Sequence, residues 1–404
     1  MAGADGGSND DVTRGTTTRF VERLEEEIAR AGEVGVGSEI DGYMVLESIG
    51  TGGNGEVWRV RHPKTGEELA LKLIKARAPG AEEMVGFKRE WETLRVLKHP
   101  NIARLYDCGW WKRAGVAAPY YVMELAQTRN GRRALGVREY ARQKKLTAEE
   151  KVGLMVGVCR ALHHAHEKGV YHRDLKPGNI AVDEMDGAAE DGLGVPKVID
   201  FGLAKVLGAE ILDPRSAVKP GDTGGTARYM APEQVRGDAG DIGPWTDVHA
   251  LGLITFELLA DRLPYNVDNM PAEVMRERIQ GARRARLTEV VKGADGELSG
   301  ILERATAAGI AERTASAKVL GDELEAWLEK RRARTRARAK VRRVVGRKRA
   351  VVLAGVACAA MVVAEVVGGG GASAEPQRGV RGEAGADGPG VGGPAVRGCG
   401  GGGD

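Results

Sequence analysis

The pattern of apolar residues changes character partway along this chain of 404 residues. From Tyr43 onward it consists of short β-type runs separated by glycine turns. Examples are Val57–Val60 and Leu69–Ile74, and a long helical pattern follows at Glu82–Leu97. After Thr147 the pattern is mostly helical. The clearest helical stretches are 147–168, 247–260 and 316–330. A strand-rich part followed by a helix-rich part predicts two lobes with a cleft between them.

Composition sets the broad class of protein. Apolar residues make up 42% of the chain, which is enough for a sizeable core. The chain has four cysteines, which are Cys108, Cys159, Cys358 and Cys399. Their spacing suggests neither a disulfide framework nor a zinc site, so a reducing compartment fits the main domain best. The first residues lack a basic and then apolar run, so we expect no cleaved secretory signal.

Residues 1–42 are expected to form a flexible N-terminal extension. Within it, Phe20, Leu24 and Ile28 are spaced by four, which is typical of a helix over 16–32. Two interpretations of this helix stay open. It either docks on the main domain or remains a partly formed helix in a flexible segment.

A GxGxxG sequence followed by valine lies near the start of the strand-rich part. Its residues are Gly50, Thr51, Gly52, Gly53, Asn54, Gly55 and Val57. Glycines let backbone amides approach phosphate oxygens without side-chain clash. A dinucleotide-binding loop would be followed directly by a helix, but here a strand follows and then Lys72. This order favours a loop that covers nucleotide phosphates as a lid, with the Lys72 ammonium on those phosphates.

The most specific stretch of the sequence is His172-Arg173-Asp174-Leu175-Lys176-Pro177-Gly178-Asn179, which matches the pattern HRDLKxxN without a departure. Asp200-Phe201-Gly202 follows downstream, after an interval lengthened by 184–196, which we expect to be an extended turn. With these motifs the chain resembles the protein kinases, specifically bacterial serine/threonine kinases of the eukaryotic (Hanks) type. The resemblance covers residues 43–329.

The resemblance implies an α+β, bilobal fold, with an antiparallel sheet and one helix in the small lobe and mainly helices in the large lobe. It implies transfer of the ATP γ-phosphoryl group to Ser or Thr hydroxyls of protein substrates in signal transduction. Asp174 would accept the proton of the hydroxyl, and Lys176 would reach the γ-phosphate. Asn179 and Asp200 would hold Mg²⁺, with Mn²⁺ as the alternative metal.

Further residues of the cleft follow from the same resemblance. Glu90 would pair with Lys72 and hold it in place. The adenine-binding set would be Met123, Glu124, Ala126, Val57 and Ala70. A pseudokinase that only binds nucleotide is the alternative. Such a protein would usually have lost one of four polar residues of the cleft. All four are present in this chain: Lys72, Asp174, Asn179 and Asp200.

The segment 225–233 resembles the end of a kinase activation segment. Glu233 would form a buried ion pair with Arg313. A phosphate on Thr223 would pair with Arg173 and order the loop, and the alternative is that Thr223 is a plain loop threonine. Autophosphorylation within a homodimer is a further expectation. Residues 172–179 resemble the catalytic loop of the family, and Asp247 would hydrogen-bond to the backbone of this loop.

The C-terminal part begins with residues 330–349, which hold twelve Lys or Arg residues and no acidic residue. The next fifteen residues, 350–364, carry no charge. We expect a basic juxtamembrane linker, then a transmembrane helix at 350–367 that contacts membrane lipid, and a disordered glycine-rich tail at 368–404. The kinase domain would then lie on the cytoplasmic side of the inner or plasma membrane. A surface-lying helix and a soluble linker in a cytoplasmic protein are the alternatives. Nucleic acid is not an expected partner, and its binding by 330–349 stays an alternative hypothesis.

Overall fold

The structure is a computed structural model that describes most of the chain. The described residues are 34–52, 55–74, 81–113, 116–185, 192–201, 227–237, 239–267, 270–281 and 283–368. The predicted helix at 16–32, the segment 202–226 with Thr223, and the tail beyond position 368 lie outside them. The chain divides into two compact units, 1–335 and 336–404, and both predicted lobes belong to the first unit.

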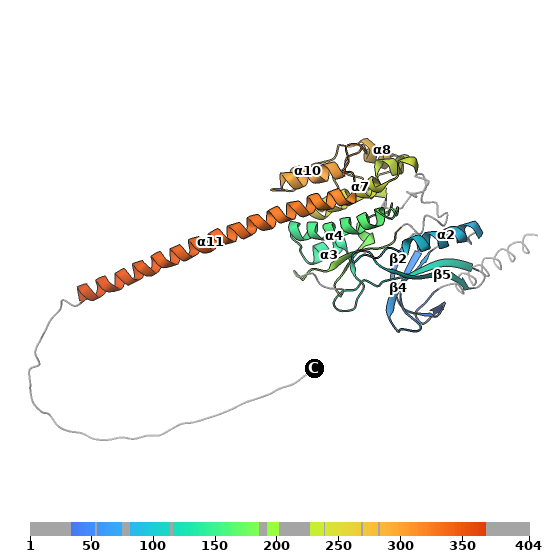
Figure 1. Ribbon diagram of the computed structural model, residues 1–404, viewed down its shortest axis with the longest axis horizontal. Helices are drawn as coiled ribbons and strands as arrows, with labels where there is room; N and C mark the ends of the chain where they lie inside the picture. Colours follow the sequence, from blue (N-terminus) through green and yellow to red (C-terminus); the bar gives the residue numbers. More distant parts are fainter. Residues whose placement is uncertain are drawn as a thin grey trace, which may run out of the picture. The chain divides into compact units, whose positions relative to one another are not determined.

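Six antiparallel strands form the sheet of the first lobe in the order β1-β2-β3-β4-β6-β5. The strands are β1 (Glu39–Ile40), β2 (Tyr43–Gly52), β3 (Gly55–Arg61), β4 (Glu68–Ile74), β5 (Leu105–Arg113) and β6 (Val116–Met123). Helix α2 (Ala81–Leu94) lies against this sheet (Figure 1). The rings of Phe87 in α2 and Trp110 in β5 are 5.4 Å apart. The helix ends three residues earlier than predicted, shortly before Pro100, which cannot continue a helix.

Strand β4 is buried on both of its faces. Leu69, Leu71 and Leu73 belong to an apolar cluster on one face. Ala70 and Ile74 belong to the larger core, to which α2 also contributes. Because side chains alternate along a strand, Lys72 projects from the same face as these two residues. The strand therefore directs a lysine toward the cleft from within an apolar run.

Strand β3 begins with a glycine that no other residue can replace without strain. Gly55 has φ of +146°, and a Cβ atom there would lie 2.2 Å from the carbonyl oxygen of Leu73. We expect Gly55→Ala to lower the free energy of unfolding by about 1–3 kcal/mol, the cost of one strained backbone position. The control is Gly52→Ala, since no described atom lies within 4 Å of a Cβ at Gly52. Equal urea midpoints for the two variants would contradict the argument.

The second lobe consists mainly of helices, with a small sheet beside the cleft. Its helices are α3 (Val137–Gln143), α4 (Ala148–His166), α6 (Pro232–Arg236), α7 (Pro244–Ala260), α8 (Ala272–Gly281), α9 (Leu287–Val290) and α10 (Gly296–Ala305). The small sheet has the order β7 (Leu135–Gly136), β8 (Ile180–Asp183) and β9 (Val195–Val198). Helix α4 begins with a capping box, in which Thr147 and Glu150 each bond the other's backbone N–H. The two-lobe prediction is confirmed.

Helix α11 (Ala317–Gly368) joins three segments that the sequence analysis treated separately. Its first turns are part of the core of the second lobe, where Leu324, Trp327 and Leu328 are buried. Within the described part of the chain, no helix is long and apolar enough to cross a lipid bilayer.

Candidate active site

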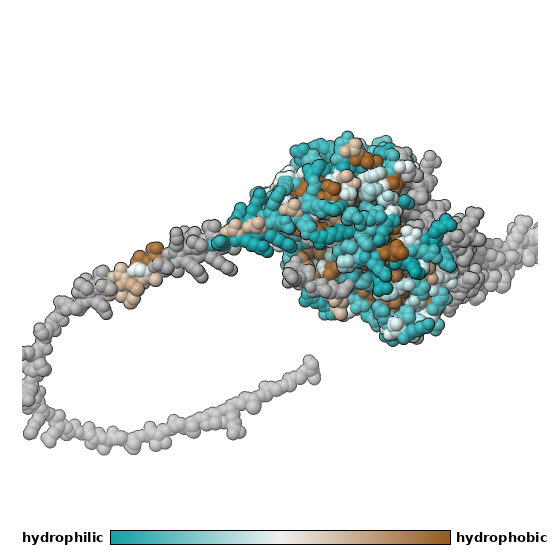
Figure 2. Space-filling view, viewed as in Figure 1, coloured by the Kyte–Doolittle hydropathy of each residue, from teal (hydrophilic) through white to brown (hydrophobic). Residues whose placement is uncertain are grey.

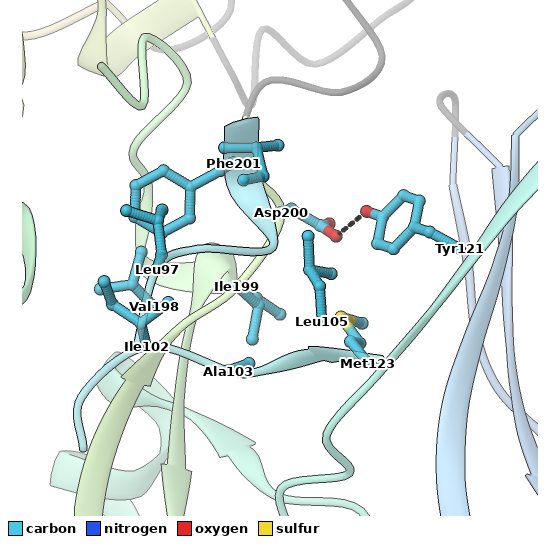
Figure 3. Close-up of a pocket in the computed structure, with 11 residues that line it drawn as sticks. Leu97, Ile102, Ala103, Leu105, Tyr121, Met123, Val198, Ile199, Asp200 and Phe201 are labelled. Atoms are coloured by element: carbon cyan, nitrogen blue, oxygen red, sulfur yellow. Dashed lines mark hydrogen bonds between the residues drawn. The ribbon is translucent and has the colours of Figure 1, made fainter. Parts of the chain in front are cut away.

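Asp200 follows strand β9, and two side chains of the six-stranded sheet, Lys72 and Tyr121, contact its carboxylate. Figure 3 shows the contact with Tyr121. Nζ of Lys72 in β4 lies 2.5 Å from Oδ2, and the hydroxyl of Tyr121 in β6 donates to Oδ1 at 2.5 Å. Lys72 and Tyr121 are direct partners in the pairing of β4 with β6, so their side chains project side by side. The backbone of Asp200 has φ of +61°, a conformation that the surrounding structure must hold in place.

The charges around Asp200 keep this carboxylate ionised. Burial raises the pKa of Asp200, but the positive charge of Lys72 and the hydrogen bonds from Lys72 and Tyr121 outweigh burial, so the pKa lies below its ordinary value. Burial and the negative charge of Asp200 raise the pKa of Tyr121 well above its ordinary value. Tyr121 is therefore a neutral donor and Asp200 an anionic acceptor.

The catalytic loop forms a second polar cluster around Asp174. Nζ of Lys176 lies 3.1 Å from Oδ2 of Asp174. The short 3₁₀ turn η1 (Pro177–Asn179) brings Asn179 back toward the same residue. Its Nδ2 donates to the backbone carbonyl of Asp174 at 2.8 Å. The carboxylate thus lies beside a lysine and an amide whose direction is set by the backbone.

Asp247 of helix α7 accepts hydrogen bonds from the backbone of the catalytic loop. Its Oδ2 accepts a hydrogen bond from the N–H of His172, and its Oδ1 accepts one from the N–H of Arg173, both at 2.8 Å. The predicted bond from Asp247 to the loop backbone is therefore confirmed. Nε2 of His166 also lies 2.8 Å from Oδ2. Burial raises the pKa of Asp247, but the hydrogen bond and charge of His166 outweigh it, so the pKa lies below its ordinary value.

The two clusters are joined by the residues that flank Asp200. The N–H of Ile199 donates to the carbonyl of Asn179 at 3.0 Å. Nε2 of His172 lies 3.0 Å from the carbonyl of Ile199. On the other side, the ring of Phe201 lies 4.9 Å from the ring of His172. Short contacts therefore connect the chain around Asp200 to both ends of the catalytic loop.

The glycine hairpin is formed by strands β2 and β3, and strands β4 and β6 adjoin it in the same sheet. Gly50 pairs with Val57, Thr51 with Glu56 and Gly52 with Gly55 across β2 and β3. Ala70 pairs with Met123 across β4 and β6, and both side chains are buried. Gly53 and Asn54 lie outside the described residues. The predicted residues of this region therefore come together as far as the structure describes them.

After β6 the chain forms the segment that connects the lobes. The N–H of Glu124 donates to the carbonyl of Arg104 at 2.8 Å, and the carbonyl of Ala126 accepts from Ala134 at 3.0 Å. Over the residues that the structure describes, the carbonyl of Glu124 and the N–H of Ala126 make no backbone hydrogen bond outside the strands. Among the described residues, a backbone carbonyl and a backbone N–H two residues apart thus lack a backbone partner there.

Helix α2 carries Glu90, but the side chain of Glu90 lies outside the described part of the structure. The ion pair predicted between Glu90 and Lys72 therefore stays a prediction. The cation of Lys72 is paired with Asp200, an arrangement that the sequence analysis did not anticipate.

The predicted ion pair between Glu233 and Arg313 is confirmed. Nη1 of Arg313 lies 2.7 Å from Oε1 of Glu233, and both side chains are fully buried. Nη2 donates to Oε2 at 3.1 Å, so the guanidinium binds the carboxylate with both of its ends. Thr246 donates a further hydrogen bond to Oε1 at 2.9 Å. The pair attaches helix α6, which follows the activation segment, to the core of the second lobe.

The oxygens of Asp200 and Asn179 fit a divalent metal ion. Carboxylate and amide oxygens are ligands that Mg²⁺ accepts. The amide nitrogen of Asn179 is bound by the carbonyl of Asp174, which leaves the amide oxygen as the ligand atom. Oδ2 of Asp200 already faces a cation, the ammonium of Lys72. Together these residues would hold Mg²⁺ near the terminal phosphates of a nucleotide.

Some residues of the site were missed by the sequence analysis. Tyr121 binds Asp200, His166 binds Asp247, and Lys197 lies 2.7 Å from Oε1 of Glu124. Gln234 donates to the carbonyl of Arg173 at 2.7 Å. All four approach their partners from distant parts of the sequence, and only the pairing of β4 with β6 would have pointed to Tyr121.

A two-lobed fold, in which a glycine hairpin pairs with the strand that carries Lys72, is the architecture of a protein kinase. The sequence matches the protein kinase domain family over residues 43–321, and the chain belongs to this family. The crystal structure of the Mycobacterium tuberculosis PknI kinase domain superposes with a TM-score of 0.53 and 26% identity. The superposition covers 72% of this chain and 99% of the PknI kinase domain.

Curated relatives are bacterial kinases. The chain is 33% identical to the probable serine/threonine-protein kinase CE0033 of Corynebacterium efficiens, over 59% of this chain and 34% of the relative. It is 32% identical to the serine/threonine-protein kinase PknA of Mycobacterium tuberculosis, over 60% of this chain and 52% of the relative. The matched region thus spans between a third and about half of the length of these relatives.

Proposed function

We propose that the protein transfers the γ-phosphoryl group of ATP to Ser or Thr hydroxyls of protein substrates in signal transduction. The observation that carries this proposal is a pair of polar clusters joined by the hydrogen bond from the N–H of Ile199 to the carbonyl of Asn179. Lys72 and Asp200 form one cluster, and Asp174, Lys176 and Asn179 form the other. Phosphoryl transfer needs a positioned hydroxyl and charge stabilisation rather than covalent catalysis, and these side chains supply both.

Each residue of the chain has a separate task in this mechanism. Asp174 orients the substrate hydroxyl and accepts its proton, and the ammonium of Lys176 stabilises negative charge on the transferred group. Lys72 leaves Asp200 and binds the α- and β-phosphates. Asp200 and Asn179 would hold Mg²⁺, or Mn²⁺ in its place, and the ion would supply positive charge that offsets the charge of the phosphates.

Adenine recognition would use the segment that connects the lobes. The carbonyl of Glu124 would accept from the exocyclic amine of adenine, and the N–H of Ala126 would donate to a ring nitrogen. Val57, Ala70 and Met123 would enclose the base with apolar surface. Gly50 to Gly55 would lie over the phosphates, where the absence of side chains lets backbone amides approach the oxygens.

The test is incubation of the purified chain with γ-labelled ATP, Mg²⁺ and a general Ser/Thr protein substrate. Asp174→Asn protein, prepared in parallel, serves as the blank. We expect label on phosphoserine or phosphothreonine with wild type. No label with wild type, equal label on the blank, or label on tyrosine alone would contradict the proposal.

Autophosphorylation is the second part of the proposal. Thr223 in the activation segment would accept a phosphoryl group from a second copy of the chain in a transient homodimer. Arg173 precedes the catalytic Asp174 and would then pair with the phosphate. The initial rate of self-labelling should rise with the square of the protein concentration. A first-order dependence, or an unlabelled 200–233 peptide, would count against it.

The third part concerns residues 350–367, which we propose insert into a lipid bilayer and anchor a cytoplasmic kinase domain. The apolar side chains Val352, Leu353, Val356 and Met361 of helix α11 are all more than 60% exposed. Figure 2 shows apolar surface along part of this helix. The basic run 330–349 precedes them, which favours contact with anionic lipid headgroups. Recovery of the chain in the pellet after a carbonate wash would support insertion, and release into the supernatant would contradict it.

A further inference from the structure

Tyr121 places a hydroxyl group deep inside the cleft, where most of its neighbours are apolar. The side chain is 2% exposed and lines a cavity with Leu105, Met123 and Phe201 (Figure 3). Its hydroxyl donates to Oδ1 of Asp200 at 2.5 Å. A buried hydroxyl needs a hydrogen-bond partner, and this partner is a proposed metal ligand.

The two oxygens of the Asp200 carboxylate have partners of different chemistry. Oδ2 faces the ammonium of Lys72, and Oδ1 faces the hydroxyl of Tyr121. In the proposed mechanism Lys72 moves to the phosphates, because a lysine cation binds phosphate oxygens strongly. A neutral phenol has no such reason to leave the carboxylate. Oδ2 therefore becomes available for a cation while Oδ1 stays bound.

We propose that Tyr121 is a positioning residue that holds Oδ1 of Asp200, so that Oδ2 faces the divalent metal ion. The inference rests on the proposed kinase function, which it deepens. A carboxylate held at one oxygen cannot rotate about its Cβ–Cγ bond, so the metal finds its ligand oriented in advance. The effect of Tyr121 on the reaction thus passes through Asp200.

Tyr121→Phe tests this role, because phenylalanine keeps the ring and removes the hydroxyl. We expect the Mg²⁺ concentration for half-maximal activity to rise about tenfold, the scale of one hydrogen bond to a charged group. The value of kcat at saturating Mg²⁺ should change less than about threefold, since the carboxylate itself remains. A merely structural role would not produce this separation of metal affinity from kcat.

Tyr120→Phe is the matched control. Tyr120 is the neighbouring residue in β6, is also 2% exposed, and also donates its hydroxyl to a carboxylate, Oδ2 of Asp41 at 2.7 Å. It belongs to the apolar cluster on the opposite face of the sheet. Both variants should lose a similar amount of stability, but only Tyr121→Phe should change the metal dependence.

Metal binding is also measured without turnover. Full-length wild type and both variants are titrated with Mn²⁺ in the presence of a non-hydrolysable ATP analogue, and free Mn²⁺ is followed by its electron paramagnetic resonance signal. Weaker Mn²⁺ binding by Tyr121→Phe than by Tyr120→Phe supports the inference. Equal or tighter binding by Tyr121→Phe overturns it. If wild type transfers no phosphate, the proposed function fails, whereas a failure of the inference alone leaves wild-type transfer intact.

Discussion

Asp174→Asn is expected to lower kcat for phosphate transfer by about 10²–10⁴-fold, the usual contribution of a positioned general base. Asparagine has the same shape as aspartate but cannot accept the proton of the substrate hydroxyl. Oδ2 of Asp174 lies 3.1 Å from Nζ of Lys176, so the substitution also removes a charge that orients this lysine. The measurement is the initial rate at saturating ATP and Mg²⁺.

A measurement of nucleotide binding by Asp174→Asn distinguishes a loss of the catalytic base from a loss of folded protein. The dissociation constant for a non-hydrolysable ATP analogue should change less than about threefold, because Asp174 acts on the hydroxyl and not on the nucleotide. Asp261→Asn is the control substitution. Asp261 ends helix α7 with φ of +56°, a conformation that asparagine also tolerates, and its side chain is 64% exposed. Near wild-type rates for Asp174→Asn would contradict the assignment of the base.

Arg313→Ala is expected to lower the free energy of unfolding by about 3–5 kcal/mol, because it leaves the buried carboxylate of Glu233 without its cation. Both side chains of this pair are 0% exposed. Nη1 and Nη2 of Arg313 also donate to the carbonyls of Trp245 and Ala308, so the substitution leaves buried carbonyls without a donor as well. Urea unfolding followed by tryptophan fluorescence gives the change.

Arg304→Ala is the matched control on the surface of the same lobe. Arg304 lies 2.7 Å from Glu323, and the two side chains are 52% and 30% exposed. Solvent screens such a pair, so its loss should cost less than about 1 kcal/mol. If Arg313→Ala cost no more than Arg304→Ala, the buried pair would have no special part in stability.

The contacts within one short segment could be predicted from the sequence. Asp174, Lys176 and Asn179 lie within one short loop, so their approach follows from local spacing. The strand that carries Lys72 could also be predicted, because the residues around Lys72 are apolar. The Glu233–Arg313 pair spans a long interval, and it was predicted only because the family resemblance implied it.

Contacts between residues that lie far apart in the sequence could not be predicted from local spacing. The approach of Tyr121 to Asp200 depends on the pairing of β4 with β6 and on the path of the chain after β9. The bond from His166 to Asp247 depends on how helices α4 and α7 pack. Helix α11 was divided into separate segments because its composition changes from basic to apolar, although its backbone stays helical from Ala317 to Gly368.

The alternation along β4 would make the proposed kinase activity a sensitive measure of correct strand pairing. A slip of one residue would turn every side chain of this strand to the opposite face. Leu71 or Leu73 would then take the place of Lys72 beside Asp200, while the content of secondary structure would hardly change. A preparation with misfolded molecules would therefore show normal circular dichroism but a reduced fraction of active sites. The fraction of correctly folded molecules in a preparation should therefore be measured by active-site titration rather than by circular dichroism.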